Sequence, residues 1–543
     1  MRPTYETSAL TTSPPASLLT IIALARSGAL DRARRLFEEA GLAAVTDDPA
    51  TLGVLGRLLK DEARRAAADD RGRLWRQAGD AYARAAELSG ASYHLINAAT
   101  LALLAGDRTT AEERANLVLA RLDVGDTGPE TPYYLGATRA EALLLLGRTG
   151  EAKVALREAF QQAPEAWEDH ASTLRQFTLI LEAFGEDAAW LGPMQPPRSL
   201  HFAGHLAIAD DAGLRGRIEA TLAEERIGFA YGALAGGADL IISEAVLARG
   251  AELHLVLPAP PEVFRADSAV PLGGDWPARY DAVLAEAATL SVVEARLATT
   301  TMLHIRLAAE VAMGKAVMKA ASLASEAVQL LLIDPGAATG ATAAIGQHWR
   351  RSGRRQLQLE VPRPEAPAAR IRPLREAPEE GVMAAMLAVA LDCEDGSGAD
   401  APDPGVLDRI GQALAACARP LATPVLAGQT LNLAFADPAE AAAAAALVVR
   451  AFGSTPARVA AHYGVARLAD NPFGGPPALV GAATAVAPDM LASTPPGAIH
   501  LSESFTAALH SWTRVMIGET PYVGELSRSG EVIPLYALTR AGP

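Results

Sequence analysis

The sequence has little cysteine and no long apolar run. Its 543 residues include two cysteines, Cys393 and Cys417, and neither has a second cysteine at a CxxC or metal-binding spacing. This predicts free thiols in a reducing compartment. No stretch reaches the roughly 20 apolar residues of a membrane helix, and the first residues lack the apolar core of a secretion signal. We therefore expect a cytoplasmic protein without a membrane partner.

Positive charge is also scarce. Forty-eight Lys and Arg residues face 63 Asp and Glu residues, which gives a formal net charge of -15. A nucleic-acid partner is excluded on this ground, because such binding needs a clustered basic face. The one basic stretch, Arg350 to Arg355, is interpreted as the solvated end of a helix.

The length and the apolar content predict a multidomain protein. Half of the residues are apolar and a fifth are charged, so the chain can build several cores, and two to four domains are expected. Residues 15–190 are rich in Ala, Leu, Glu and Arg at helical periodicity. We expect this part to be all α-helical.

A local pattern recurs three times in the helical part. Gly28, Gly106 and Gly147 are each followed five residues later by an alanine, namely Ala33, Ala111 and Ala152, and Pro164 follows the last of them. Such a glycine closes one helix in the left-handed conformation, and the alanine lets the paired helices approach closely. The pattern resembles tetratricopeptide repeats, which implies a surface for a protein partner. A generic helical bundle is the alternative.

Residues 198–358 have a different pattern, in which strands and helices alternate. The break comes at two adjacent prolines, Pro196 and Pro197, before the strand-like SLHFAGH. Alternation of this kind predicts a Rossmann-like α/β domain with a parallel sheet. A second linker at 359–381 holds five prolines between Pro362 and Pro378, and we expect it to be a semi-rigid spacer.

Two glycine-rich turns in this domain are candidate ligand sites. The first is YGALAGGAD, residues 231–239, and the second is DPGAATGAT, residues 334–342. Exposed amides at a strand-to-helix turn can hold a phosphate, and the Thr342 hydroxyl would add a donor. The alternative is that the glycines serve only tight packing. The candidate nucleotide-binding residues are Gly204, Gly232, Gly236, Gly237, Glu244, Glu310, Gly336, Gly340 and Thr342.

These segments resemble the SLOG superfamily of Rossmann-like nucleotide-binding domains. The resemblance covers FAYGALAGGADLIISEAVLARGAELHLVLP, GGDWPARYDAVLAEA, AAEVAMGKAVMKA and the second turn. It implies recognition of a nucleotide-derived small molecule. The hydrolases of that superfamily carry a Glu shortly after the glycine–threonine turn, whereas Ala343, Ala344, Ile345 and Gly346 follow Thr342 here. Sensing is therefore favoured over hydrolysis.

Residues 382–541 mix strands and helices in an α+β order. The strand-like segments are VMAAMLAVALD, QTLNLAFADP, ARVAAHYGVARL and GAIHLSESF, and TPPG predicts a tight turn with proline at its corner positions. His462 and Tyr463 lie on the third of these strands and are expected to be packed. The segments resemble a class III nucleotidyl cyclase domain, a family that needs two aspartates holding Mg²⁺, and an Asn and an Arg for the transition state.

This part departs from the cyclase pattern at the positions that carry the chemistry. Asp392 matches the first metal aspartate only with a short slip, and Ala390 falls there without it. Gln429 stands at the second metal position, and a neutral amide lacks the anionic oxygen that Mg²⁺ prefers. Ala485 replaces the Asn and Asp489 replaces the Arg. A degenerate, non-catalytic domain is expected, with neither catalytic nor metal-binding residues.

Together these patterns predict a non-catalytic signalling or scaffold protein without a required cofactor. It would sense a nucleotide in the SLOG-like domain, bind a protein through the helical repeats and form a homodimer through the cyclase-like domain. The alternative is an enzyme, either an adenylate or guanylate cyclase or a nucleotide-cleaving SLOG protein, and only the cyclase would need Mg²⁺.

Overall fold

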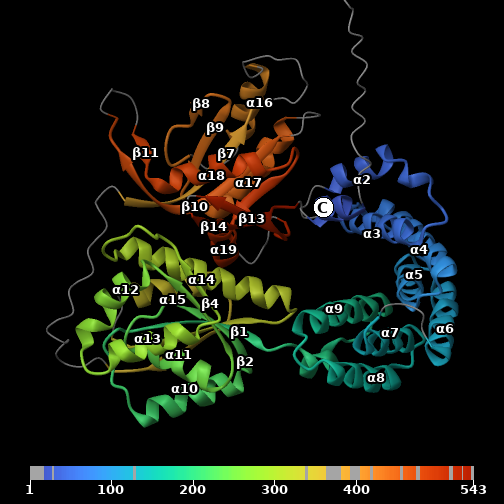
Figure 1. Ribbon diagram of the computed structural model, residues 1–543, viewed down its shortest axis with the longest axis horizontal. Helices are drawn as coiled ribbons and strands as arrows, with labels where there is room; N and C mark the ends of the chain where they lie inside the picture. The colour runs from blue at the N-terminus through green and yellow to red at the C-terminus, as the bar shows by residue number, and fades with distance from the viewer. Residues whose placement is uncertain are drawn as a thin grey trace, which may run out of the picture. The chain divides into compact units, whose positions relative to one another are not determined.

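The computed structural model describes most of the chain (Figure 1). The described residues are 18–26, 30–125, 130–336, 340–362, 381–391, 404–415, 420–452, 457–471, 477–512, 518–528 and 530–539. Gly28, Asp392, Cys393 and Cys417 lie outside these ranges, as does most of the proline-rich linker. The chain divides into two compact units, Met1–Leu156 and Arg157–Ala541. Each is considered by itself.

The described part of the first unit is helical. Its helices are α1 (Leu18–Arg26), α2 (Leu30–Glu39), α3 (Pro49–Arg65), α4 (Ala68–Ser89), α5 (Ser92–Leu104), α6 (Arg108–Val124), α7 (Pro132–Leu145) and the first half of α8 (Thr149–Gln162), with a short 3₁₀ turn η1 (Leu42–Ala44). Successive helices from α3 to α7 pack on one another. The expectation of a helical N-terminal part is confirmed.

The repeated glycine–alanine pattern has the predicted geometry at its described copies. Gly106 and Gly147 adopt φ of +86° and +71° after α5 and α7, a conformation that favours glycine because it has no Cβ. Ala111 and Ala152 are fully buried in the helices that follow. Small side chains at these positions let neighbouring helices pack closely.

The second unit begins within α8 and contains two sheets. Its first part holds α9 (Trp167–Phe184), η2 (Ala189–Met194), β1 (Arg198–Gly204), α10 (Ala212–Glu224), β2 (Ile227–Gly232), α11 (Ala238–Ala248), β3 (Glu252–Leu257), α12 (Pro261–Ser268), η3 (Val270–Leu272), α13 (Trp276–Glu286), β4 (Thr289–Val292), α14 (Met302–Ser322), β5 (Ala327–Ile333), α15 (Ala341–Arg351) and β6 (Gln356–Glu360). The alternation predicted from the sequence is confirmed.

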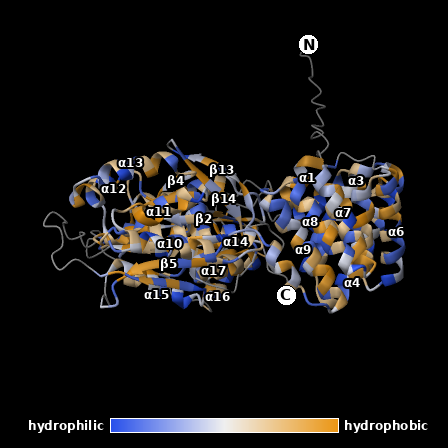
Figure 2. Ribbon diagram, turned by 90° about the horizontal axis from the view of Figure 1, so that it is seen from below, coloured by the Kyte–Doolittle hydropathy of each residue, from blue (hydrophilic) through white to orange (hydrophobic). Residues whose placement is uncertain are grey.

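The strands of this first part form one parallel sheet in the order β4-β3-β2-β1-β5-β6. Leu200 and Phe202 of β1 face a core that also contains Ile218 of α10 and Ile241 of α11. Ala203 faces the opposite side, where α14 and α15 pack. In Figure 2 the apolar residues of β5 are drawn in orange. Helices on both faces of a parallel sheet give the three-layer α/β/α arrangement.

The second sheet is mixed and has the order β13-β14-β12-β10-β7-β9-β8, with β11 paired to β10. Its elements are β7 (Gly381–Ala390), α16 (Pro404–Leu414), β8 (Val425–Ala427), β9 (Thr430–Phe435), α17 (Pro438–Ala451), β10 (Arg458–Ala469), β11 (Ala478–Val480), η4 (Ala482–Ala485), α18 (Val486–Met490), η5 (Leu491–Ser493), β12 (Ile499–Ser502), α19 (Glu503–Trp512), β13 (Tyr522–Arg528) and β14 (Glu531–Ala537). The α+β expectation is confirmed.

The turn before β12 differs by one residue from the prediction. The Ala498 amide donates to the Pro495 carbonyl, so Pro496 and Gly497 occupy the corner positions, and Gly497 has φ of +81°. Two prolines at the corners were predicted. The left-handed third position of this turn needs a glycine, which shifts the turn toward Gly497.

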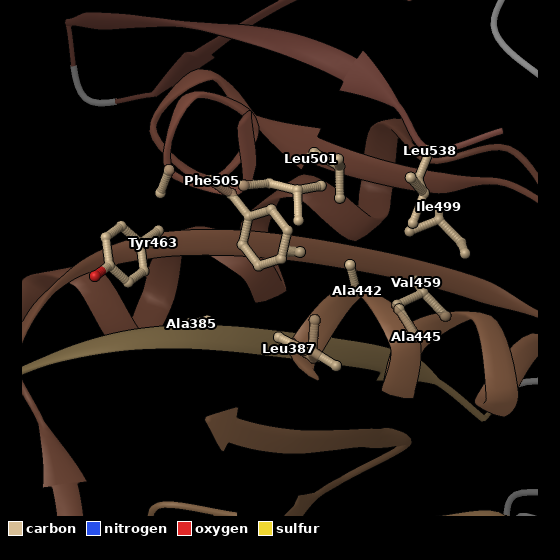
Figure 3. Packing of buried hydrophobic residues seen from close by; sticks show 14 of the residues in the cluster. Ala385, Leu387, Ala442, Ala445, Val459, Tyr463, Ile499, Leu501, Phe505 and Leu538 are labelled. Carbon is tan, nitrogen blue, oxygen red and sulfur yellow. The ribbon is translucent and has the colours of Figure 1, made fainter. Parts of the chain in front are cut away.

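The two sheets of the second unit share one core. Ala385 and Leu387 of β7 cluster with Phe505 of α19, and Val311 of α14 belongs to the same cluster. Figure 3 shows Phe505 in the middle of the labelled residues of this core. Helix α14 packs along α19, and a Cβ on Gly314 would lie 1.8 Å from the Ala507 carbonyl oxygen. The α/β part and the cyclase-like part therefore form one packed body.

Candidate functional site

The candidate site lies at the carboxyl ends of β1 and β5. These strands are neighbours in register, with Gly204 opposite Leu332. Strand β1 continues to β2 on one side and lies against β5 on the other, so strand order reverses between them. In open parallel sheets, the connections leave to opposite faces at such a point and leave a crevice for a ligand.

A cavity of about 320 Å³ occupies this crevice. Apolar side chains dominate its walls, among them Phe202, Phe264, Ile305 and Ile345. The residues around it come from the end of β1, from α11, α12, α14 and α15, and from the loops between elements: His201, Phe202, Ala203, Gly204, His205, Leu206, Ala233, Ala235, Asp239, Pro258, Phe264, Asp267, Ser268, Thr300, Ile305, Ala308, Ala309, Ala341, Thr342 and Ile345.

Asp239 is the most buried acid of the crevice. Its side chain follows the first glycine turn at the start of α11, and the residue is 7% exposed. Its Oδ2 accepts from the Ala235 amide at 3.3 Å, whereas Oδ1 is buried near the Gly204 amide without a hydrogen bond of normal geometry. Burial raises the pKa of Asp239 to about 7, because a low-dielectric environment disfavours the carboxylate.

A second acid, Asp267 at the end of α12, lines the same cavity. Its Oδ2 accepts from the Thr300 amide at 2.8 Å. The Thr300 hydroxyl is buried without a partner. Among the described residues that line the crevice, no Lys or Arg is present, so its charged groups are acids.

The first glycine turn is closely packed in the structure. A Cβ on Gly237 would lie 2.0 Å from the Leu206 carbonyl oxygen, and one on Gly236 would lie 2.3 Å from Leu272. The Ala238 amide at the start of α11 donates to the His205 carbonyl at 3.1 Å. Gly204 and Gly232 are also at close approaches, to Ala238 and Phe202. This geometry favours the packing alternative for these four glycines over a phosphate cradle.

The second turn is more open, but its threonine is already engaged. Thr342 Oγ1 donates to the Gly204 carbonyl at 3.0 Å, which joins the start of α15 to the end of β1. Gly340 has φ of +103°, with open space where a Cβ would stand. Gly336 donates its amide to the Asp334 side chain at 2.9 Å. A second cavity, of about 380 Å³, lies beside Gly340 and Arg350.

Glu244, a predicted ligand contact, takes part in an ion-pair cluster away from the crevice lining. Its two carboxylate oxygens accept from Arg279 at 2.7 and 2.9 Å, and Oε2 also accepts from Arg215 at 2.9 Å. Asp210 pairs with the same two arginines. The cluster ties α11 to α10 and α13, which is a structural arrangement.

Glu310, another predicted ligand contact, points toward the cyclase-like part. Its residue is 3% exposed, and its Oε2 accepts from the Tyr463 hydroxyl at 3.0 Å and from Trp512 Nε1 at 2.9 Å. Burial raises the pKa of Glu310, and the two hydrogen bonds oppose that rise. Sequence reasoning missed this role, because the three residues are up to 202 positions apart.

At the predicted metal positions of the cyclase-like part the structure describes Ala390 and Gln429, whereas Asp392 lies outside the described residues. The Leu391 amide, at the end of β7, donates to the Gln429 carbonyl in the β8–β9 turn at 2.8 Å. Asp489 is paired with Arg528. Within the described ranges, no group of three or more His, Cys, Asp or Glu side chains could hold a metal ion. The described residues therefore do not fit a pair of Mg²⁺ ions.

Asp239 and Asp267 were not among the predicted site residues. Asp239 directly follows the glycine pair of the first turn, so its place at a helix start was a signal in the sequence. Asp267 carries no such signal, since it comes to the crevice from α12, and only the fold brings it near β1.

Comparison with protein families gives a match in the N-terminal helical part. A family model described as Tetratricopeptide Repeats-Sensor matches residues 1–102. No curated protein matches the chain. Among the described residues, no helix is both long and apolar enough to cross a membrane.

Several solved structures of cyclases align with about a third of the chain. The adenylyl cyclase CyaB from P. aeruginosa is 13% identical, with a TM-score of 0.24 and coverage of 30% of this chain and 97% of that chain. The guanylate cyclase domain of RhGC from Catenaria anguillulae is 15% identical, with a TM-score of 0.25 and coverage of 30% of this chain and 98% of that chain. The adenylate/guanylate cyclase/hydrolase from Silicibacter pomeroyi is 19% identical, with a TM-score of 0.25 and coverage of 30% of this chain and 98% of that chain.

Proposed function

We propose that the chain is a non-catalytic signalling protein that senses a nucleotide-derived ligand in the crevice between β1 and β5. One observation carries the proposal: α14 is both a wall of the crevice and the helix on which the cyclase-like part packs. Ile305, Ala308 and Ala309 line the cavity, and Gly314 contacts Ala507 of α19 two turns further along.

Polar contacts reinforce this coupling along α14. Besides Glu310, the Lys315 ammonium pairs with Glu503 of α19 at 3.0 Å. Lys319 pairs with Glu168 of α9 at 2.7 Å, and Arg175 of α9 donates to the Ser322 carbonyl at 2.8 Å. A ligand that moves α14 would therefore change the packing of both α9 and α19, which a sensor requires.

The helical repeats would supply the protein partner of this sensor. The match of residues 1–102 to the sensor-type repeat family supports that role. The cyclase-like part would serve as a dimerisation and output surface, because Gln429, Ala485 and Asp489 stand where a cyclase needs an aspartate, an asparagine and an arginine. No metal and no catalytic residue is assigned.

Ligand binding can be tested by thermal shift on the full chain with ribonucleosides and nucleotides. A ligand at a hundred times its Kd stabilises the folded protein by about 2.7 kcal/mol, so a rise in Tm is expected. Ala309→Phe fills the crevice and should abolish the rise, whereas the control Ala220→Phe, on the exposed face of α10, should keep it. An unchanged rise in Ala309→Phe would move the site elsewhere, and no response to any compound would refute nucleotide sensing.

A further inference from the structure

The crevice has an electrostatic character that constrains its ligand. Its ionisable carboxyl groups are Asp239 and Asp267, and its described lining contains no Lys or Arg. A phosphate carries one to two negative charges, and in a partly buried site repulsion from a carboxylate a few ångströms away costs several kcal/mol. No side chain of this lining therefore offers a phosphate a permanent positive charge.

The backbone offers little compensation at the start of α11. Helix starts attract anions through free amides, but the Ala238 amide is already bonded to the His205 carbonyl. The Thr342 hydroxyl donates to the Gly204 carbonyl, so it presents its oxygen as an acceptor. The Ala238 amide is therefore not available to a ligand, and Thr342 offers a ligand an acceptor rather than a donor.

The same lining holds buried oxygen atoms without a hydrogen-bond partner of normal geometry. Asp239 Oδ1 is one of these atoms, and the Thr300 hydroxyl oxygen is another. A buried polar atom without a partner costs about 1–3 kcal/mol, and native sites seldom retain one without a functional reason. A ligand with hydrogen-bond donors would satisfy Asp239 and recover that cost.

The size and the apolar walls set the rest of the ligand's chemistry. A volume of about 320 Å³ is at the lower end of ligand pockets. Phe202, Phe264 and Ile305 offer apolar contacts to a flat heterocycle. A nucleoside combines such a ring with donors on its ribose hydroxyls.

We propose that the crevice binds an uncharged nucleoside, with donors of the nucleoside hydrogen-bonded to Asp239, and that it discriminates against the corresponding 5′-phosphate. The inference rests on the proposed function and narrows its ligand class. The ring lies against the apolar wall formed by Phe264 and Ile305. Asp267, which also lines the cavity, adds to the exclusion of anions.

Calorimetry on the full chain at pH 8, above the pKa of about 7 that burial gives Asp239, with the four ribonucleosides and their 5′-monophosphates tests the inference. At least one nucleoside should bind ten times more tightly than its monophosphate. Asp239→Asn keeps the shape of the side chain but replaces one acceptor with a donor, and should weaken that nucleoside at least tenfold, since hydrogen bonds to charged groups contribute about 1.5–3 kcal/mol. Arg350→Ala, in the neighbouring cavity, should leave its affinity unchanged.

The outcomes separate the inference from the proposed function. A monophosphate that binds as tightly as its nucleoside, or more tightly, overturns the inference and leaves nucleotide sensing intact. Failure of every nucleoside and monophosphate to bind overturns both. Should the thermal melt of Asp239→Asn show that this variant is unfolded, Asp267→Asn provides the second variant. It should improve monophosphate binding at least threefold. An unchanged ratio of the affinities for the nucleoside and its monophosphate would count against the proposal.

Discussion

Glu310 is one of the residues at which the α/β part and the cyclase-like part meet through hydrogen bonds. Its Oε2 accepts from both Tyr463 and Trp512, while His348 Nδ1 lies 3.8 Å from its other oxygen. The carboxylate is held in a buried position by donors from a region far away in the chain. Removing it leaves these donors in the core.

We expect Glu310→Ala to destabilise the second unit by about 2–4 kcal/mol, because two buried donors lose their acceptor. Glu310→Gln retains one acceptor oxygen and should cost about 1 kcal/mol or less. Urea denaturation of the full chain measures both. Equal losses for the two variants would show that the hydrogen bonds contribute little.

Asp239 makes stability depend on pH in a definite direction. Its pKa is about 7 in the folded protein against 3.8 for the ordinary group, so the folded state holds the proton more strongly. Stability from this residue is therefore present at low pH and is lost as the pH rises toward 7. Asp239→Asn removes this pH dependence. The free energy of unfolding of the variant minus that of the parent should therefore rise by about 2 kcal/mol from pH 5 to pH 8. Urea denaturation at both values checks this, and a difference independent of pH would contradict it.

At the scale of elements, the close packing of α14 on α19 depends on a glycine. The Gly314 Cα faces the backbone of Ala507, which leaves no space for a Cβ. Elsewhere, a glycine within a helix weakens it by about 0.5–1 kcal/mol relative to alanine. Its presence in α14 is explained by the approach of the second helix.

Two glycine-to-alanine changes separate helix propensity from packing. Gly314→Ala should destabilise the second unit by about 1–3 kcal/mol, because the helices must move apart. Gly216→Ala in α10, where a Cβ would meet open space, should stabilise it by about 0.5–1 kcal/mol. Thermal melting of both variants tests the pair, and a stabilised Gly314→Ala would refute the close packing.

At the scale of the whole molecule, we expect no cyclase activity. Gln429 and Asp489 occupy the positions of a metal-binding aspartate and of the transition-state arginine, and Asp489 is paired with Arg528. Purified protein with ATP or GTP and Mg²⁺ or Mn²⁺ should form no cyclic nucleotide above background. Product formation that Asp392→Ala abolishes would establish the enzymatic alternative.

The cyclase-like part is also expected to form a homodimer. Leu426 and Val480 are 49% and 41% exposed on β8 and β11, and large apolar side chains at a surface favour association. The isolated fragment would uncover the face of α19 that contacts α14, so light scattering should use the full chain. The double substitution Leu426→Lys and Val480→Lys should convert the dimer to a monomer. The control Leu117→Lys, at a residue of α6 that is 56% exposed, should leave the dimer intact. A monomeric parent at micromolar concentration would refute the dimer.

The sequence by itself determined the local elements, because hydrophobic periodicity and turn residues act over a few positions. It predicted β1, β7 and the left-handed glycines Gly106 and Gly147. Only the tertiary structure decided what the long-range neighbours do. Glu310 and Glu244 looked alike as helix acids, yet one joins the two sheets and the other an arginine cluster. Asp267 reaches the crevice only because the parallel sheet gathers loops at its carboxyl edge, a consequence of strand order that periodicity does not contain.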